Sequence, residues 1–128
     1  MFNFLSSKSN NTAQQLVAVV KGSQVAIKTV PTNHIKKTIG YGSNGKPLNC
    51  QVSPDLKLVV CTTDKGIVCI SEIAVGGIKR TFGHTAQFGS GAQAINASWI
   101  DNKTILVNTN KGSAYQVEIN TGASRKIS

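Results

Sequence analysis

The amino-acid sequence predicts an all-β protein, and three observations support that prediction. The apolar residues come in short runs of about four to six positions, rich in Val, Ile and Leu, without the spacing of an amphipathic helix. Gly, Asn, Asp and Pro separate these runs, as expected for strands joined by tight turns. The pattern also repeats along the chain, which is typical of repeat architectures.

We expect eleven strands, and a twelfth over Phe2–Leu5, each defined by one apolar run and ended by turn-forming residues. In chain order the eleven are Gln15–Val20, Gln24–Val30, His34–Ile39, Leu48–Ser53, Lys57–Thr62, Ile67–Ile73, Ile78–Phe82, Ala94–Ile100, Thr104–Asn108, Ala114–Ile119 and Ser124–Ile127.

The repeat is clearest in the second and third thirds of the chain. The segment that starts at Asp55 aligns without a gap on the segment that starts at Asp101, at an offset of 46 residues. The first third aligns more loosely, through "IKKTIG" at Ile35–Gly40 and "IKRTFG" at Ile78–Gly83. We therefore expect a single domain, 1–128, made of the approximate repeats 1–47, 48–93 and 94–128.

Each repeat is expected to form a four-stranded antiparallel sheet. In the second repeat, Pro54-Asp55 marks one turn and Asp64-Lys65-Gly66 marks a tight hairpin, because these residue types suit the backbone angles of such turns. One sheet of this kind cannot bury both faces by itself. The repeats should therefore stack face to face.

The stretch "SPDLKLVVCTTDKGIVCISEI", Ser53 to Ile73, resembles one repeat of the WD40 and related β-propeller families. Gly83-His84, followed by the strand that contains Trp99, is similar to the start of the next repeat. The chain has no Trp-Asp dipeptide after the third strand of a repeat, so the resemblance is to propeller blades in general. It implies three propeller-like blades.

Three blades raise the question of ring closure, because propellers normally contain about four to eight blades. An open array of three would leave a large apolar face at each end, and such faces promote association. We therefore expect a homodimer that completes a six-bladed ring. The alternatives are a trimer, docking onto another protein's incomplete ring, and a β-sandwich with a different strand pairing.

The chain is strongly basic, with 14 Lys and Arg residues against 5 Asp and Glu residues and a net charge of +9. Basic residues on the outermost strand of each blade have two explanations: they protect a sheet edge from aggregation, or they form a partner-binding rim for an acidic surface. The candidate rim residues are Lys36, Lys37, Lys79, Arg80, Arg125 and Lys126, with Tyr41 and Phe88 as candidate flanking aromatics.

No catalytic, cofactor-binding or metal-binding residues are expected. Most of the acids repeat at equivalent positions, as scaffold residues do, and neither His34 nor His84 has an acid or nucleophile beside it in the sequence. The three cysteines, Cys50, Cys61 and Cys69, lack the close pairing of zinc ligands. We expect them to be reduced and packed, as in a cytoplasmic protein.

Two functions remain open. The first is a non-catalytic interaction module that binds a protein partner, and the second is a nucleic-acid-binding accessory protein with sequence-independent phosphate contacts. No apolar run approaches the length needed to cross a bilayer, so no membrane partner is expected. The partner's identity is not encoded in any recognisable motif.

Overall fold

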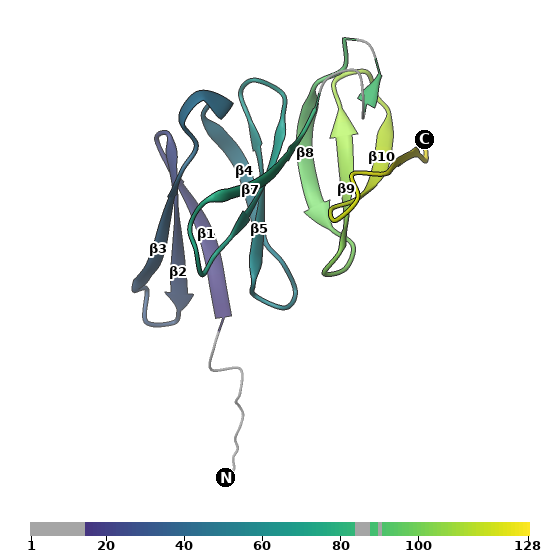
Figure 1. The fold of residues 1–128 in the computed structure, drawn as a ribbon. Helices are drawn as coiled ribbons and strands as arrows, with labels where there is room; N and C mark the ends of the chain where they lie inside the picture. Colours follow the sequence, from purple (N-terminus) through teal and green to yellow (C-terminus); the bar gives the residue numbers. More distant parts are fainter. Residues whose placement is uncertain (1–14, 84–87, 90) are drawn as a thin grey trace.

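The computed structural model describes residues 15–83, 88–89 and 91–128, which form three antiparallel sheets that lie side by side in chain order (Figure 1). We call these sheets blade 1, blade 2 and blade 3. Blade 1 contains β1 (Gln15–Lys21), β2 (Gln24–Val30) and β3 (Ile35–Gly40); blade 2 contains β4 (Pro47–Val52), β5 (Leu58–Thr63), β6 (Val68–Glu72) and β7 (Ile78–Phe82); blade 3 contains β8 (Ala94–Trp99), β9 (Thr104–Thr109), β10 (Ala114–Glu118) and β11 (Ser124–Lys126). The prediction of an all-β fold built from propeller-like blades is confirmed.

Within each blade the strands pair in chain order, β1-β2-β3, β4-β5-β6-β7 and β8-β9-β10-β11. The predicted four strands are therefore present in blades 2 and 3, whereas blade 1 has three in the described part of the chain. The predicted strand Phe2–Leu5 lies outside the described residues. β3, β7 and β11 are the last strands of their sheets, and β4 and β8, the first strands of blades 2 and 3, pack beside each other.

The sequence repeat corresponds to a repeated hairpin. Between β5 and β6, Gly66 has a φ of 77° and donates its backbone N–H to the carbonyl of Thr63 at 3.0 Å. Between β9 and β10, Gly112 has a φ of 79° and donates to Thr109 at 3.1 Å. A positive φ of this size is easily adopted only by glycine, which explains why both repeats carry it.

The core consists of two apolar clusters, each between two neighbouring blades. Blade 2 contributes to both of them, so each of its faces is covered. The cluster between blades 1 and 2 contains Leu16, Val25, Ile27, Ile39, Tyr41, Val59, Cys61, Cys69 and Ile73. The cluster between blades 2 and 3 contains Val60, Val68, Ile70, Phe82, Phe88, Ala92, Ala94, Ile105, Val107, Val117 and Ile119. The two end faces, on blades 1 and 3, have no neighbouring sheet among the described residues.

The cysteines differ from the expectation. Cys50 on β4 and Cys61 on β5 lie opposite each other in the register and form a disulfide, with their Cα atoms 4.2 Å apart. Cys61 also faces Cys69, on the neighbouring strand β6. Cys69 is a buried free thiol, and burial raises the pKa of this thiol to about 11. The prediction that all three are reduced is therefore wrong for Cys50 and Cys61, because strand register brings together residues whose sequence spacing suggests no pairing.

The one complete helical element among the described residues is a three-residue 3-10 helix, Gly42–Asn44. None of this part of the chain forms a helix with the length and apolar character needed to cross a membrane.

Candidate interaction surfaces

The six predicted rim residues all lie on the outermost strands of the three blades. Lys36 and Lys37 are on β3, Lys79 and Arg80 on β7, and Arg125 and Lys126 on β11. All of them except the half-buried Lys37 are exposed. The structure therefore places them at three separate sheet edges, and their side chains make different contacts.

The second basic residue of the repeated phrase contacts the next blade. The side chain of Lys37 lies over Gly76 of blade 2, where an added Cβ would be 3.0 Å from Lys37 Cδ. The side chain of Arg80 lies over Gly122 of blade 3, where an added Cβ would be 3.1 Å from Arg80 Nη2. Both glycines have a positive φ, 86° and 77°. We call this repeated contact the inter-blade clamp.

Arg80 shows why the clamp stabilises the stacking of blades. Its Nη1–H donates to the backbone carbonyl of Asn120 at 2.7 Å, and its guanidinium carbon lies 5.6 Å from the centre of the Phe82 ring. The hydrogen bond joins blade 2 to blade 3, and a hydrogen bond to a charged group contributes about 1.5–3 kcal/mol. The contact with Phe82, a residue of the same strand, holds the guanidinium in place for that bond. Sequence reasoning missed this role, although the glycine pair Gly76 and Gly122 repeats at the same offset as the rest of the unit.

The two predicted flanking aromatics do not flank a surface. Tyr41 and Phe88 are each only 1% exposed, and each belongs to one of the two apolar clusters. Tyr41 donates its hydroxyl hydrogen to Cys61 Sγ at 2.9 Å, and burial raises the pKa of Tyr41 to about 12. Phe88 packs against Tyr115 with ring centroids 5.6 Å apart. The prediction that these rings lie beside a basic surface is wrong, because the apolar area they bury fills the space between blades.

The repeated acids close turns, as the sequence suggested. Asp55 Oδ1 accepts hydrogen bonds from the Ser53 hydroxyl at 2.6 Å and from the backbone N–H of Lys57 at 3.1 Å, and these lower the pKa of Asp55. Asp101 Oδ1 accepts the backbone N–H of Lys103 at 2.8 Å, which lowers the pKa of Asp101. In the part of the chain that the structure describes, no group of three or more His, Cys, Asp and Glu side chains could hold a metal ion.

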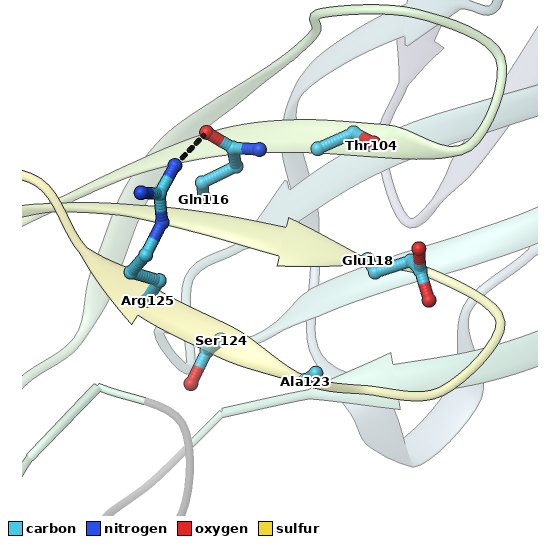
Figure 2. Close-up of a pocket in the computed structure, with 6 residues that line it drawn as sticks. All are labelled: Thr104, Gln116, Glu118, Ala123, Ser124 and Arg125. Atoms are coloured by element: carbon cyan, nitrogen blue, oxygen red, sulfur yellow. Dashed lines mark hydrogen bonds between the residues drawn. The ribbon is translucent and has the colours of Figure 1, made fainter.

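The end face of blade 3 carries a group of polar side chains. A shallow hollow of about 200 Å³ lies on this face, and in it Arg125 Nη2 donates to Gln116 Oε1 at 3.1 Å. Figure 2 shows this hydrogen bond, with Glu118 at the other end of the hollow. The remaining lining residues are Thr104, Ala123 and Ser124. Arg125 shares with Arg80 the face that points onward along the array, but no further blade among the described residues lies beyond it.

Comparison with blade 2 shows how blade 3 differs. The positions of blade 2 that pack toward blade 3 are Leu58, Val60, Val68 and Ile70, and at an offset of 46 blade 3 has Thr104, Leu106, Ala114 and Gln116. Half of the apolar side chains are thus replaced by polar ones. A polar outer face is typical of the terminal repeat of an array. The end face of blade 3 is therefore less apolar than the corresponding face of blade 2.

The end face of blade 1 carries exposed apolar side chains, and all the charged residues of this blade are lysines. Val17, Lys28 and Ile35 form one row across β1, β2 and β3, and Val17 and Ile35 are 42% and 54% exposed. Blade 1 contains four lysines and no Asp or Glu, since the five acids of the chain all lie between residues 55 and 118. Blade 1 therefore presents apolar and positively charged side chains on a face that no other described part of the chain covers with a sheet.

Comparisons with known proteins support the fold only. No family model and no curated protein matches the sequence. Among solved structures, a chain in the crystal structure of the mitotic checkpoint complex matches with a TM-score of 0.70 and 14% sequence identity, over 91% of this chain and 33% of that one. The chain thus spans about a third of the length of that protein. The likeness shows that the three stacked sheets follow the arrangement of a segment of a larger known fold.

Proposed function

We propose that the chain is a non-catalytic, propeller-like interaction module that binds a protein partner at the end of blade 1. The observation that carries this proposal is the difference between the end faces of blade 1 and blade 3. Blade 2 has an apolar cluster on each face, and the end of blade 3 carries Thr104, Gln116 and Arg125 around a polar hollow, whereas the row across the end of blade 1 exposes Val17 and Ile35. Exposed apolar groups gathered on one face are characteristic of interaction sites.

Two further observations support a binding role without catalysis. Asp55 and Asp101 are committed to hydrogen bonds within their own turns, so they are not available as an acid–base pair. One solved structure with a similar fold is a chain of the mitotic checkpoint complex. Use of such a fold as a scaffold is consistent with that setting.

The proposal is tested with two isoleucines of matched exposure. Ile35, 54% exposed, lies on the uncovered face of blade 1, and Ile100, 51% exposed, lies in the β8–β9 turn of blade 3. Proteins that co-purify with the native chain should be lost from Ile35→Glu and retained by Ile100→Glu, since a buried unpaired charge costs several kcal/mol at an interface. Equal retention, or equal loss with both variants folded, contradicts the proposal.

A homodimer that closes a six-bladed ring is an alternative way to cover blade 1. In that ring the end of blade 1 would pack on the end of blade 3 of the second copy. The hollow with Gln116, Glu118 and Arg125 offers polar groups to that contact, whereas the contact between blades 2 and 3 is apolar. Desolvating unmatched polar groups opposes association. We therefore favour a different protein as the partner, and the mass in solution separates the two cases.

Nucleic-acid binding is the second candidate, and the charge distribution favours it. The exposed first basic residues of the repeated phrase, Lys36 and Lys79, make none of the clamp contacts. Phosphate binding should weaken by orders of magnitude between about 50 and 200 mM salt, because fewer counterions are released. If the chain binds this way, Lys36→Glu with Lys79→Glu abolishes binding to a labelled DNA or RNA strand. If it does not, the native chain shows no salt-dependent binding.

A further inference from the structure

Blade 1 lacks, among the described residues, the first strand that blades 2 and 3 possess. β5 pairs with β4 and β6, and β9 pairs with β8 and β10. β1 is their counterpart, because Ala18 opposes Ile27 as Val60 opposes Ile70, and Ile27 and Ile70 in turn oppose the clamp residues of β3 and β7. In the described part of the chain β1 pairs only with β2, so one of its edges is open.

The register shows which backbone groups lie at that edge. In blade 2 the short Cα distance of Cys50 and Cys61, 4.2 Å, marks a non-hydrogen-bonded pair. The flanking residues Val60 and Thr62 therefore direct their N–H and C=O groups toward β4. Their counterparts on β1 are Ala18 and Val20, so these residues direct the same groups toward the open edge. An unpaired row of this kind is a template for another strand.

A groove lies where the extra strand would be. It has a volume of about 260 Å³ and lies between β1 and β4, lined by Leu16, Val17, Ala18, Cys50, Gln51 and Val52. In the next pair of blades β4 itself occupies the corresponding place beside β8. There Asn49 Nδ2 donates to the Ile95 carbonyl at 3.2 Å, and the Trp99 backbone N–H donates to Gln51 Oε1 at 2.8 Å. The groove therefore lies beside β4, as an inner strand of blade 1 would by analogy with β4 beside β8.

We propose that this groove accepts an extended acidic segment of the partner protein, which pairs antiparallel with β1 as the inner strand of blade 1. Main-chain pairing supplies affinity in this mode of recognition, and side-chain pockets supply specificity. The proposal rests on the proposed function and specifies how the partner binds.

The charge of blade 1 defines the chemistry of the partner segment. Lys21 ends β1, Lys28 lies on the neighbouring strand, and the blade has no acid. At the same sequence distance before β1 as β4 stands before β5, the chain reads "LSSKSN", from Leu5 to Asn10, which includes a lysine and no β-branched or aromatic residue. The predicted strand Phe2–Leu5 overlaps this stretch at Leu5 alone. Such a sequence has low strand propensity and the same charge sign as the blade. A segment from another protein with glutamate or aspartate beside β-branched residues is complementary.

The first test is hydrogen exchange of the full-length chain, followed by NMR. In the free chain the amides of Ala18 and Val20 should exchange rapidly, whereas those of Val17 and Val19, which point toward β2, should be protected. Slow exchange of Ala18 and Val20 in the free chain contradicts the proposal, because it means that the chain's own residues already pair there. If that protection grows with protein concentration, a second copy is the occupant, which also contradicts it.

The second test uses a peptide of alternating valine and threonine, flanked by glutamates and blocked at both ends. Addition of the peptide should protect Ala18 and Val20. Two forms carry equal numbers of N-methyl groups, one on odd and one on even residues, so only one form loses the N–H groups that face β1. That form should bind at least ~10-fold more weakly than the other. Equal affinities exclude strand pairing.

A lysine-flanked version of the peptide and one protein variant complete the design. The lysine version should bind more weakly than the glutamate version, and equal binding contradicts the assigned charge. Ala18→Pro removes an edge N–H without breaking a bond to β2, and should weaken binding by at least ~10-fold. If Ile35→Glu abolishes partner binding while the partner leaves exchange at Ala18 and Val20 unchanged, the strand proposal fails and the proposed interaction function stands.

Discussion

At the scale of single residues, Gly122 and the Arg80 side chain above it define how one blade is held against the next. A side chain at Gly122 would meet two obstacles, the positive φ of 77° and the guanidinium 3.1 Å away. Gly112 has the first obstacle alone, with a φ of 79° and open space, and Gly40 has neither. These three glycines therefore separate backbone strain from the loss of the clamp.

We predict that Gly40→Ala changes the free energy of unfolding by no more than about 0.5 kcal/mol, and that Gly112→Ala lowers it by roughly 1 kcal/mol. Gly122→Ala should lower it by roughly 2 kcal/mol, because it also displaces Arg80. Urea unfolding at constant m-value provides the measurement. Equal effects of Gly112→Ala and Gly122→Ala would show that the clamp does not stabilise the fold.

The two turn carboxylates, Asp55 and Asp101, predict that the free energy of unfolding falls at acid pH. The pKa values of Asp55 and Asp101 are lower in the folded than in the unfolded chain, so their contribution is complete above about pH 5 and is lost as the pH falls through the folded values. Asp55→Asn with Asp101→Asn keeps an oxygen that accepts the same hydrogen bonds but removes the titration. Urea unfolding should show a smaller loss of stability between pH 7 and pH 3 for this variant than for the native chain. An unchanged loss contradicts the assignment.

The third prediction concerns the three cysteines, which face one another across β4, β5 and β6. The disulfide between Cys50 and Cys61 leaves Cys69 as the one free thiol of three cysteines. A thiol reagent should therefore titrate one group per chain under non-reducing denaturing conditions, and three after reduction. Three reactive thiols before reduction would mean that Cys50 and Cys61 are not joined.

At the scale of the elements, most strands could be predicted because each is one apolar run between turn residues. The hairpins at Gly66 and Gly112 could be predicted for the same reason, since glycine at a positive φ is a local requirement. The contacts between elements could not. The burial of Tyr41 depends on the space between blades 1 and 2, and the pairing of Cys50 with Cys61 depends on strand register.

The repeated basic phrase illustrates the same limit. Its position on the outer strands β3 and β7 followed from the order of strands in each repeat. The different roles of its two basic residues did not, because they depend on which turn of the next blade lies beneath each side chain. Lys37 and Arg80 meet Gly76 and Gly122, whereas Lys36 and Lys79 remain on the exposed edge.

At the scale of the whole molecule, the array has two unlike ends. Blade 3 ends in Thr104, Gln116 and Arg125, whereas blade 1 ends, among the described residues, in an unpaired edge of β1 and a row that exposes Val17 and Ile35 beside Lys28. Thr104→Leu and Gln116→Ile introduce the residues that blade 2 has at the equivalent positions, and should make the end of blade 3 more apolar. We predict that this double variant self-associates at concentrations where the native chain does not, as measured by sedimentation velocity. If the double variant behaves as the native chain does, polarity at this end does not limit association.

The mass of the native chain in solution, measured by light scattering over a range of concentrations, tests the central claim most directly. If the polar side chains of blade 3 oppose self-association and blade 1 binds a different protein, the mass should remain that of one chain, 13.5 kDa. A stable species of twice that mass would contradict this account, because a second copy would then cover the surface assigned to the partner.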